Sequence, residues 1–382
     1  MKVLLIAPGP VDHAVACANG LAAHADVVLA APARLYGDLQ DSLDPRIDLR
    51  LVPWPRTRSV RNPLMLARLL GITHRVRPDV IHVLSNTTLW LNAIAPVLRS
   101  YAPLVTTVHD VLAHPGDRDT RRLPDWSARL MARQSDHLVV HGLAIRQAAA
   151  ARLGKPMSRI HVVPHPAITR YADLARTHAL VRTAGPAGLR VLMFGRLFAY
   201  KGVDDLIRAE AILGDRLAGL SLTIAGRGDD PSRLEALMGQ PQRYDIRLGH
   251  IADRDVAQLF LDTDIVVLPY VEASQSGVLM IAATFGKPVI VTDVGELGTT
   301  VRQCGAGLVV PPRNPPALAQ AMLVLGNDPV LREQLAAHAR AWADGPIRPD
   351  NVGGQLIGLY HRILPESRSP DRSDAPGFGR SH

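Results

Sequence analysis

The sequence predicts an α/β protein in which two doubly wound, mostly parallel sheets face each other across a cleft. The first observation is the length of 382 residues, which suggests two or three domains. The second is an alternation of short β-branched apolar runs with helix-like segments, which is typical of parallel sheets covered by helices. The third is a break at residues 166–190, which hold no strand-like run and after which the alternation starts again.

The first half of the chain predicts six strands with helices between them. The expected strands are residues 2–7, 26–30, 80–83, 104–108, 137–140 and 160–163. Helix-like segments lie at residues 13–24, 64–75, 128–133 and 144–152. Continuous apolar runs of this kind favour strands that are buried on both faces.

The second half repeats the pattern after a Gly- and Pro-containing stretch, residues 184–188, that reads as the end of a linker. The expected strands are residues 190–194, 221–225, 246–248, 265–268 and 288–291, with a helix at 203–213. Ligands of open α/β sheets bind beyond the carboxyl ends of the strands. Two such sheets therefore make the cleft between them the expected site.

The composition excludes several classes of protein. Hydrophobic residues make up 47% and charged residues 20% of the chain, as in a globular enzyme. No apolar run reaches the roughly 18 residues of a membrane-spanning helix, and the short run Val3–Ala7 does not resemble a secretory signal. The two cysteines, Cys17 and Cys304, form no disulfide framework, so a reducing cytoplasm is expected.

The net positive charge of the chain lies in its first half. Residues 1–180 hold 22 Lys and Arg against 13 Asp and no Glu, whereas residues 181–382 hold 21 against 22 Asp and Glu. The first half is therefore expected to meet something anionic. Aromatic residues are only 4% of the chain, so no base-stacking platform is indicated, and an anionic membrane surface or acceptor is favoured over nucleic acid.

A glycine and two cations follow the first strand of the second half. Gly195 and Arg196 come directly after residues 190–194, and Lys201 precedes the helix expected at 203–213. A glycine lets a ligand approach the backbone, and Arg and Lys supply a fork and a compact charge for phosphate. The pattern fits a diphosphate site, and it also fits an ordinary loop with surface cations.

A segment of small residues, Glu272–Met280, follows the strand at 265–268 and leads into a helix. Free N–H groups and the positive dipole end of a helix favour phosphate there, and Glu272 is able to bond to sugar or ribose hydroxyls. Capping of the helix by Ser274 or Ser276 is the alternative, and both roles are compatible.

His109 stands at the carboxyl end of the strand at 104–108, on an edge that faces the cleft. An imidazole there is able to bond to a sugar hydroxyl or to carry a proton. A structural histidine is the alternative, because the chain holds 15 histidines.

Three other patterns indicate local structure. Gly226–Asp229 lacks the full dinucleotide fingerprint and predicts a tight turn. Asp264, two residues after Asp262, is expected to hold the turn into a buried strand. His161 and His165 have no carboxylate or cysteine near them at ligand spacing, so no metal site is predicted. The sequence also lacks a nucleophile elbow, a Walker loop and a His-Glu-x-x-His motif.

Taken together, these motifs resemble those of the family 4 retaining glycosyltransferases of the GT-B fold (glycosyl transferases group 1), over residues 1 to about 364. The specific parts in the second half are Gly195–Leu197, Lys201-Gly202, Leu222–Gly226, Leu248–Ile251, Asp264–Pro269, Glu272 with Ser276–Val278, Gly286–Ile290 and Val294-Gly295. The parts in the first half are Arg77–His82, Val108–Asp110 and Ser135-Asp136.

The resemblance implies how the chain is divided. Residues 1–178 would form a Rossmann-like acceptor-binding domain, and residues 186–346 a Rossmann-like domain that binds a nucleotide-sugar donor. Residues 347–365 would form a helix that crosses back to the first domain. Residues 366–382, rich in Ser, Arg, Asp, Pro and Gly, are expected to be disordered.

The resemblance also implies roles for single residues. Arg196 and Lys201, beside Gly195, would hold the donor diphosphate and stabilise its charge as it leaves. The start of the next helix would add backbone N–H groups to the same phosphates, at Ser276, Gly277 and Val278. The loop Gly249-His250-Ile251 would frame the nucleobase. Glu272 would contact the donor sugar, and His109 would lie near the reacting sugar.

One departure from the family pattern stands in this segment. The family usually carries two Glu residues with seven residues between them, and Glu272 fits the first with a one-residue shift. The second falls at or near Met280 or Ile281, and neither is acidic. A lost contact to the ribose would cost about 1–3 kcal/mol unless Ser274, Gln275 or Ser276 replaces it.

The implied reaction moves a sugar from a UDP- or GDP-sugar to a glycan or lipid-linked acceptor with retention of configuration, in polysaccharide or glycolipid biosynthesis. No metal cofactor is expected, because two cations and a helix start stabilise the leaving diphosphate. Basic residues of the first half would dock on the inner face of an anionic membrane. They are Arg56, Arg58 and Arg61, and Arg118, Arg121 and Arg122; solvated helix faces are the alternative.

Three alternatives stay open at this point. Another GT-B enzyme, such as a sugar-nucleotide epimerase or a phosphorylase, needs cleft acids or a cofactor lysine that the sequence does not clearly offer. A non-catalytic GT-B subunit is favoured by the missing second Glu and opposed by the retained Arg196 and Lys201. A nucleic-acid binder is supported only by charge.

Overall fold

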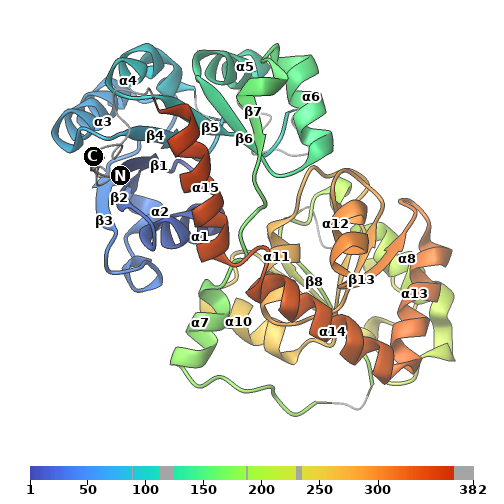
Figure 1. Ribbon diagram of the computed structural model, residues 1–382. Coiled ribbons are helices and arrows are strands. Elements are labelled where there is room, and N and C mark those ends of the chain that lie inside the picture. The colour runs from blue at the N-terminus through green and yellow to red at the C-terminus, as the bar shows by residue number, and fades with distance from the viewer. Residues whose placement is uncertain (88, 112–123, 186–187, 229–234, 365–382) are drawn as a thin grey trace, which may run out of the picture.

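The computed structural model describes residues 1–87, 89–111, 124–185, 188–228 and 235–364 of the chain. These residues form two lobes, each a parallel sheet with helices on both faces (Figure 1). We call the part around the first sheet the first lobe and the part around the second sheet the second lobe. The predicted disordered tail at 366–382, and Arg118, Arg121 and Arg122, lie outside the described residues.

The first sheet has seven parallel strands in the order β3-β2-β1-β4-β5-β6-β7. The strands are β1 (Lys2–Ile6), β2 (Asp26–Pro32), β3 (Asp48–Val52), β4 (Val80–Val83), β5 (Leu104–Thr107), β6 (His137–Val140) and β7 (Ile160–Val162). Helices of this lobe are α1 (Val11–Ala22), α2 (Ala33–Tyr36), α3 (Asn62–Val76), α4 (Ala95–Tyr101), α5 (Asp125–Gln134) and α6 (Leu143–Leu153).

The second sheet has six parallel strands in the order β10-β9-β8-β11-β12-β13. The strands are β8 (Arg190–Phe194), β9 (Ser221–Gly226), β10 (Tyr244–Leu248), β11 (Ile265–Leu268), β12 (Val289–Thr292) and β13 (Gly307–Val310). The helices that follow β7 are α7 (Arg170–Thr177), α8 (Val203–Leu213), α10 (Asp253–Asp262), α11 (Gly277–Thr284), α12 (Leu297–Cys304), α13 (Pro315–Asn327), α14 (Pro329–Asp344) and α15 (Pro349–Ile363).

The central strands match the predicted ones because their signal is burial on both faces. Every residue of β4, β5, β6, β11 and β12 is buried, which is why these strands read as continuous apolar runs. Beyond β7 the break predicted at 166–190 holds no strand within the described residues until β8 begins at Arg190, but it does hold the helix α7.

The sequence analysis missed two strands, β3 and β13, which both lie at sheet edges. In β3, Asp48 and Arg50 pair with each other at the surface, and charged residues of this kind are typical of protected edge strands. β13 begins at Gly307, where a side chain would have its Cβ 1.9 Å from the carbonyl oxygen of Val289. The backbone contact requires glycine, and this glycine shortens the apolar run from which a strand would be predicted.

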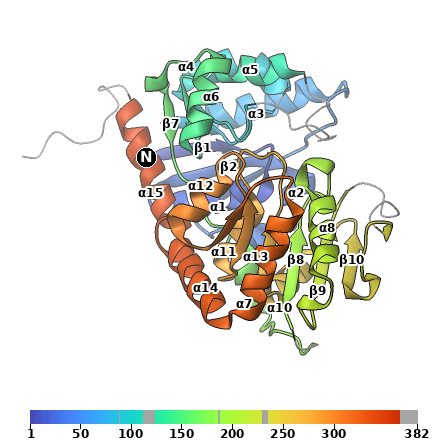
Figure 2. The same cartoon turned by 90° about the vertical axis from the view of Figure 1, so that its right-hand side faces the viewer.

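The helix α15 packs on the first lobe although it follows α14 of the second lobe (Figures 1 and 2). Its Val352, Leu356, Leu359 and Tyr360 belong to the core around β1 and β2. Tyr360 also bonds through its hydroxyl to Nδ1 of the buried His82, at 2.6 Å. The chain therefore returns to the first lobe and completes its core.

Two glycines let α15 approach α1 closely. A Cβ on Gly20 of α1 would lie 2.0 Å from the carbonyl oxygen of Pro349, and one on Gly353 would lie 2.1 Å from the carbonyl oxygen of Gly20. Both contacts are to backbone, which cannot rotate away. The neighbouring Gly354 faces only the far end of His24, 3.6 Å away.

The two segments that cross between the lobes lie side by side. The backbone N–H of Ala167, after β7, donates to the carbonyl oxygen of Ile347, between α14 and α15, at 2.8 Å. Next to this point Arg170 of α7 pairs with Asp12 of α1 at 2.5 Å and with Asp253 of α10 at 2.6 Å. The guanidinium thus joins the first lobe to the second.

The glycines of α15 give a prediction about stability. Gly353→Ala is expected to lower the free energy of unfolding by about 1–3 kcal/mol, because the methyl group pushes α15 away from α1. Gly354→Ala is the matched control and should be neutral or stabilising by up to about 1 kcal/mol, because alanine favours a helix and finds room. Urea unfolding of both variants measures the difference, and equal stabilities would contradict the close packing.

Candidate functional site

The glycine loops that follow β8, β9 and β10 pack against one another at the carboxyl edge of the second sheet. The N–H of Gly195 donates to the carbonyl oxygen of Ala225 at 3.0 Å, and the N–H of Gly249 donates to that of Gly226 at 2.9 Å. Gly226 has φ +142°, and a Cβ there would lie 1.7 Å from the carbonyl oxygen of Gly195. Only glycine fits this position, so the edge presents backbone to the cleft.

Lys201 lies over the ring of the buried Tyr270, and the positive charge of Arg196 acts on the same phenol. Nζ of Lys201 lies 3.6 Å from the centre of the Tyr270 ring, directly after β11, and 5.0 Å from the Tyr200 ring. Burial raises the pKa of Tyr270 to about 12, against the opposing effects of a hydrogen bond to Ser276 and the positive charge of Arg196. The two predicted cations therefore share one neighbourhood, with a neutral phenol at its centre.

The start of helix α11 belongs to the same neighbourhood. The hydroxyls of Ser276 and Tyr270 lie 3.1 Å apart, and Ser276 is the N-terminal cap residue, without a side-chain capping bond. Val278 lies in the first turn, 3.4 Å from where a Cβ of Gly195 would stand. A Cβ on Gly277 would lie 3.3 Å from Ile168, in the segment between the lobes. The structure thus brings Gly195, the two cations and the helix start together.

The other predicted donor residues lie around this group. Gly249 has φ +124° with open space beside it, His250 is exposed, and Ile251 packs on the core of the second lobe. Glu272 is exposed and lines a cavity of about 510 Å³ together with Gly202, Arg208 and other residues. The roles proposed for the nucleobase loop and for Glu272 stay predictions.

The place of the family's second Glu is apolar in the structure as well. Met280 and Ile281 are each 2% exposed and belong to the core of the second lobe. Of the polar residues considered as substitutes, Gln275 is engaged elsewhere, because its Nε2 donates to the carbonyl oxygen of His141 in the first lobe at 3.0 Å. Ser276 bonds to Tyr270.

A carboxylate of the second lobe caps a helix of the first. Oε1 of Glu296 accepts from the backbone N–H groups of Ala144 at 2.6 Å and Ile145 at 3.4 Å, at the start of α6. Glu296 is buried and lies next to α12. A negative charge at a helix N-terminus is favourable. Glu296 also lines a cavity of about 420 Å³ between the lobes. The contact between Glu296 and α6 therefore joins the two lobes next to this cavity.

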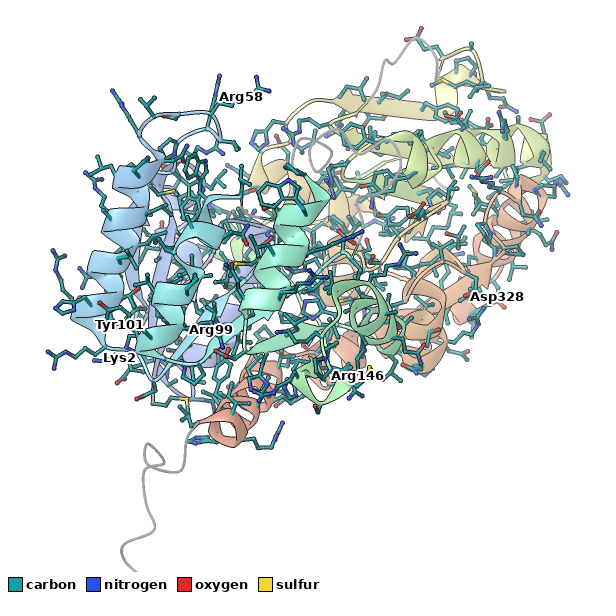
Figure 3. All side chains as sticks on the ribbon, turned by 90° about the horizontal axis from the view of Figure 1, so that it is seen from above. Lys2, Arg58, Arg99, Tyr101, Arg146 and Asp328 are labelled. Carbon is teal, nitrogen blue, oxygen red and sulfur yellow. The ribbon has the colours of Figure 1, made fainter. Side chains whose placement is uncertain are left out.

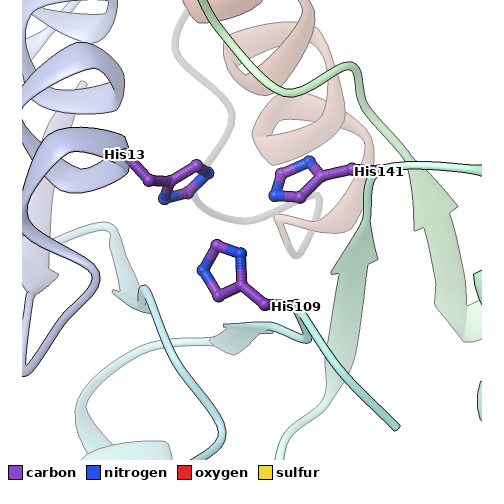
Figure 4. A group of neighbouring side chains, drawn as sticks. All are labelled: His13, His109 and His141. Atoms are coloured by element: carbon purple, nitrogen blue, oxygen red, sulfur yellow. The ribbon is translucent and has the colours of Figure 1, made fainter. Parts of the chain in front are cut away.

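His109 lies at the carboxyl end of β5, as predicted, but it does not stand alone. Its ring neighbours His13 of α1 and His141, which follows β6; the centres of its ring and theirs lie 4.5 Å and 5.3 Å away (Figure 4). His165, after β7, completes the group at 4.8 Å from His13. We call these four residues the histidine cluster.

Burial keeps the histidine cluster uncharged. Burial lowers the pKa of His165 to about 4, and it also lowers the pKa of His13, His109 and His141. At His13 and His141 the repulsion between two charged imidazoles lowers the pKa further. All four imidazoles are therefore neutral at neutral pH, with a lone pair on one ring nitrogen each.

The sequence reasoning missed Tyr270, Glu296, His13 and His141, and it assigned His165 of the cluster to local structure. A signal existed for Tyr270, which directly follows a buried strand and the motif proline Pro269. Glu296 also stands next to a motif glycine, Gly295. Asp264 and His161, for which structural roles were expected, make structural hydrogen bonds. Asp264 accepts from the backbone N–H of Arg190 at 2.9 Å, and His161 bonds to His137 at 3.0 Å.

Family profiles match both lobes. The profile described as "Glycosyl transferase 4-like domain" matches residues 9–166, and the one described as "Glycosyl transferases group 1" matches residues 188–328. D-inositol 3-phosphate glycosyltransferase of Xylanimonas cellulosilytica is 30% identical over 308 residues, which cover 74% of this chain and 71% of that protein. The chain belongs to the group 1 glycosyltransferases.

Further relatives agree with this family and with the fold. Alpha-D-kanosaminyltransferase of Streptomyces kanamyceticus is 27% identical over 273 residues, covering 68% of this glycosyltransferase and 71% of that protein. The crystal structure of HepE from Anabaena, in complex with UDP, superposes with a TM-score of 0.69 at 17% identity, over 95% of this chain and all of the other. The predicted GT-B fold is confirmed.

The buried His82 makes the stability of the glycosyltransferase depend on pH. Burial, with a smaller effect of His109, lowers the pKa of His82 from 6.5 to about 3, while its ring bonds to Tyr360 and Thr107. Below pH 6.5 the unfolded chain takes up a proton at this position that the folded chain does not. The contribution of His82 to stability is thus complete above pH 6.5 and is lost as the pH falls toward 3.

At pH 5.5 we expect this single group to lower the free energy of unfolding by about 1 kcal/mol relative to pH 7.5. Urea unfolding in EDTA at both pH values measures the fall. In His82→Asn the fall should be smaller by that amount, whereas the control His178→Asn, at an exposed position, should keep it. An unchanged fall in His82→Asn would show that His82 does not cause it.

Proposed function

We propose that this glycosyltransferase moves a sugar from a UDP- or GDP-sugar to a glycan or lipid-linked acceptor, with retention of configuration and without a divalent metal. The observation that carries the proposal is the convergence of Arg196, Lys201 and the start of α11 on Tyr270. Two fixed cations and free helical N–H groups suit a diphosphate. HepE of Anabaena, which shares the fold, has been solved with UDP and with UDP-glucose.

The proposed reaction uses the two cations to stabilise the leaving group. The bond between the anomeric carbon and the diphosphate oxygen breaks, and its electron pair stays on the diphosphate. Arg196, Lys201 and the helix start stabilise the charge that develops there. The acceptor hydroxyl attacks from the same face and passes its proton to the leaving phosphate, so the reaction needs no protein base. Glu272 is proposed to contact the donor sugar and His109 the reacting sugar.

The proposed acceptor side is the first lobe, which carries the positive charge of the chain. Within the described residues no helix is both long enough and apolar enough to span a bilayer. The loop before α3 exposes Arg56, Arg58 and Arg61, and beside them Val60 and Leu64 are 93% and 57% exposed (Figure 3). Cations interleaved with exposed apolar side chains suit an anionic membrane surface.

This basic loop is held in shape by hydrogen bonds. Nδ2 of the buried Asn62 lies within 3.1 Å of the carbonyl oxygens of Arg56, Thr57 and Ser59. Nε1 of Trp90 donates to the carbonyl oxygen of Thr57 at 2.7 Å. A loop that is ordered before binding loses little conformational entropy at the membrane. We therefore propose that the enzyme works at the cytoplasmic face of the membrane, in polysaccharide or glycolipid biosynthesis.

Thermal unfolding with UDP, GDP, ADP and dTDP, with and without EDTA, tests the donor site. One nucleotide is expected to stabilise the protein, by about 2.7 kcal/mol at 100 times its dissociation constant, and EDTA should not change the size of that shift. Arg196→Ala and Lys201→Ala should abolish the shift and slow transfer by about 100-fold or more. The control Arg176→Ala, at an exposed arginine of α7, should keep both. Stabilisation by none of the nucleotides would contradict the proposal.

Co-sedimentation with vesicles tests the membrane contact separately. Binding to vesicles that contain phosphatidylglycerol is expected to exceed binding to neutral vesicles. Replacing Arg56, Arg58 and Arg61 together by Gln should weaken it by about fivefold per charge. The control replaces three exposed arginines of the second lobe, Arg216, Arg254 and Arg302. Equal binding to both kinds of vesicle would reject docking and leave the donor site untouched.

A further inference from the structure

The histidine cluster brings together four imidazoles from four separate segments at one edge of the first sheet. The centre of the His13 ring lies 4.5 Å from that of His109, 4.9 Å from that of His141 and 4.8 Å from that of His165. The two that are nearest in sequence, His141 and His165, are still 24 positions apart. Figure 4 shows the rings of His13, His109 and His141 pointing toward one another.

The hydrogen bonds of the cluster fix where the lone pairs are. Nδ1 of His141 lies 2.9 Å from the carbonyl oxygen of Val163, and Nε2 of His109 lies 3.1 Å from that of Leu84. A carbonyl oxygen only accepts, so these two nitrogens carry the protons. The lone pairs are then on Nε2 of His141 and Nδ1 of His109. His165 follows the same rule, because its Nδ1 donates to the carbonyl oxygen of Pro166 at 2.8 Å.

One of these lone pairs is left without a partner. Nε2 of His141 is buried and makes no hydrogen bond in the described part of the chain, and the residue is only 8% exposed. A buried polar atom without a partner is unfavourable. Of its ring neighbours, His109 and His165 donate their N–H groups to carbonyl oxygens and therefore offer it lone pairs only.

We propose that His13, His109 and His141 bind one transition-metal ion of the Zn²⁺ class. One ligand nitrogen of each lies within 4.8 Å of the others. Neutral imidazoles are the ligands that zinc, nickel and copper prefer, and a metal-bound histidine typically donates its other ring N–H to a backbone carbonyl. His109 and His141 already do so. An ion would also give Nε2 of His141 the partner that it lacks.

Binding would draw the three rings slightly together. Nitrogens bound to one tetrahedral ion at about 2.0–2.1 Å lie about 3.4 Å apart, whereas the ligand atoms of the three histidines lie within 4.8 Å of one another without an ion. Two further groups stand beside the site. His165 holds its lone pair in the same cluster, and Sγ of Cys17, one turn after His13 on α1, lies 3.4 Å from Nε2 of His13.

The proposed ion would lie apart from the proposed diphosphate site. Its ligands belong to α1 and to the loops after β5 and β6 of the first lobe, whereas Arg196 and Lys201 follow β8 of the second lobe. The inference rests on the geometry of the cluster and not on the proposed function. His109 belongs to both proposals. With Nδ1 on the ion and Nε2 donating to the carbonyl oxygen of Leu84, its ring has no nitrogen left for a sugar, so the two proposed roles of His109 are alternatives.

Equilibrium dialysis of the full chain against Zn²⁺ tests the proposal, after removal of bound metal with EDTA and in an excess of Mg²⁺. One zinc ion per chain is expected. His13→Gln and His141→Gln should each weaken binding by at least about tenfold. The control His161→Gln changes a half-buried histidine that pairs with His137 outside the cluster, and it should retain the ion.

Two further measurements test whether the variants are folded and whether nitrogen atoms bind the ion. Circular dichroism and thermal unfolding in EDTA establish that each variant is folded, and the two cluster variants are independent of each other. Co²⁺ bound to the unmodified protein should give the visible absorption of a nitrogen-ligated ion, and His161→Gln should keep it. Absence of stoichiometric zinc, or zinc that both cluster variants retain, would overturn the proposal.

Discussion

The placement of the lobes depends on one buried cation, Arg170. Its side chain is only 9% exposed, and it pairs with Asp12 of the first lobe and Asp253 of the second while its guanidinium stacks on Tyr171. A buried charge that loses a partner costs several kcal/mol, so both carboxylates have to stay in reach. Glu296 and Gln275 add two more polar contacts across the same divide. Together these contacts fix which loops of the two sheets face each other.

The two facing edges have different electrostatic character. The second lobe presents fixed cations and a helix start around Tyr270, which suit an anion. The first lobe carries most of the net positive charge of the chain, yet its cleft edge is lined by neutral histidines, because burial there disfavours a charged imidazole. Exposed arginines such as Arg58 supply the charge at its surface instead.

The sequence predicts the parts of this molecule whose signal is local. Buried central strands such as β4 and β11 are continuous apolar runs, and the motif from Gly195 to Lys201 is short and follows one of them. The edge strands β3 and β13 carry charges or a glycine and give no such signal. The histidine cluster could not be predicted either, because His13, His109 and His141 are separated by long stretches of chain, and only the fold brings the three residues together. Arg170 and Glu296 are likewise single residues whose partners lie far away in sequence.

The return of α15 to the first lobe has a consequence for the order of folding during synthesis. Val352, Leu356, Leu359 and Tyr360 are synthesised after the whole second lobe, but they complete the core around β1 and β2. Domains of a nascent chain usually fold in turn from the N-terminus. In this chain the first lobe is left with an uncovered apolar face until the second lobe has been made. The core of the first lobe therefore stays open to non-native contacts for longer than in a chain with two self-contained halves.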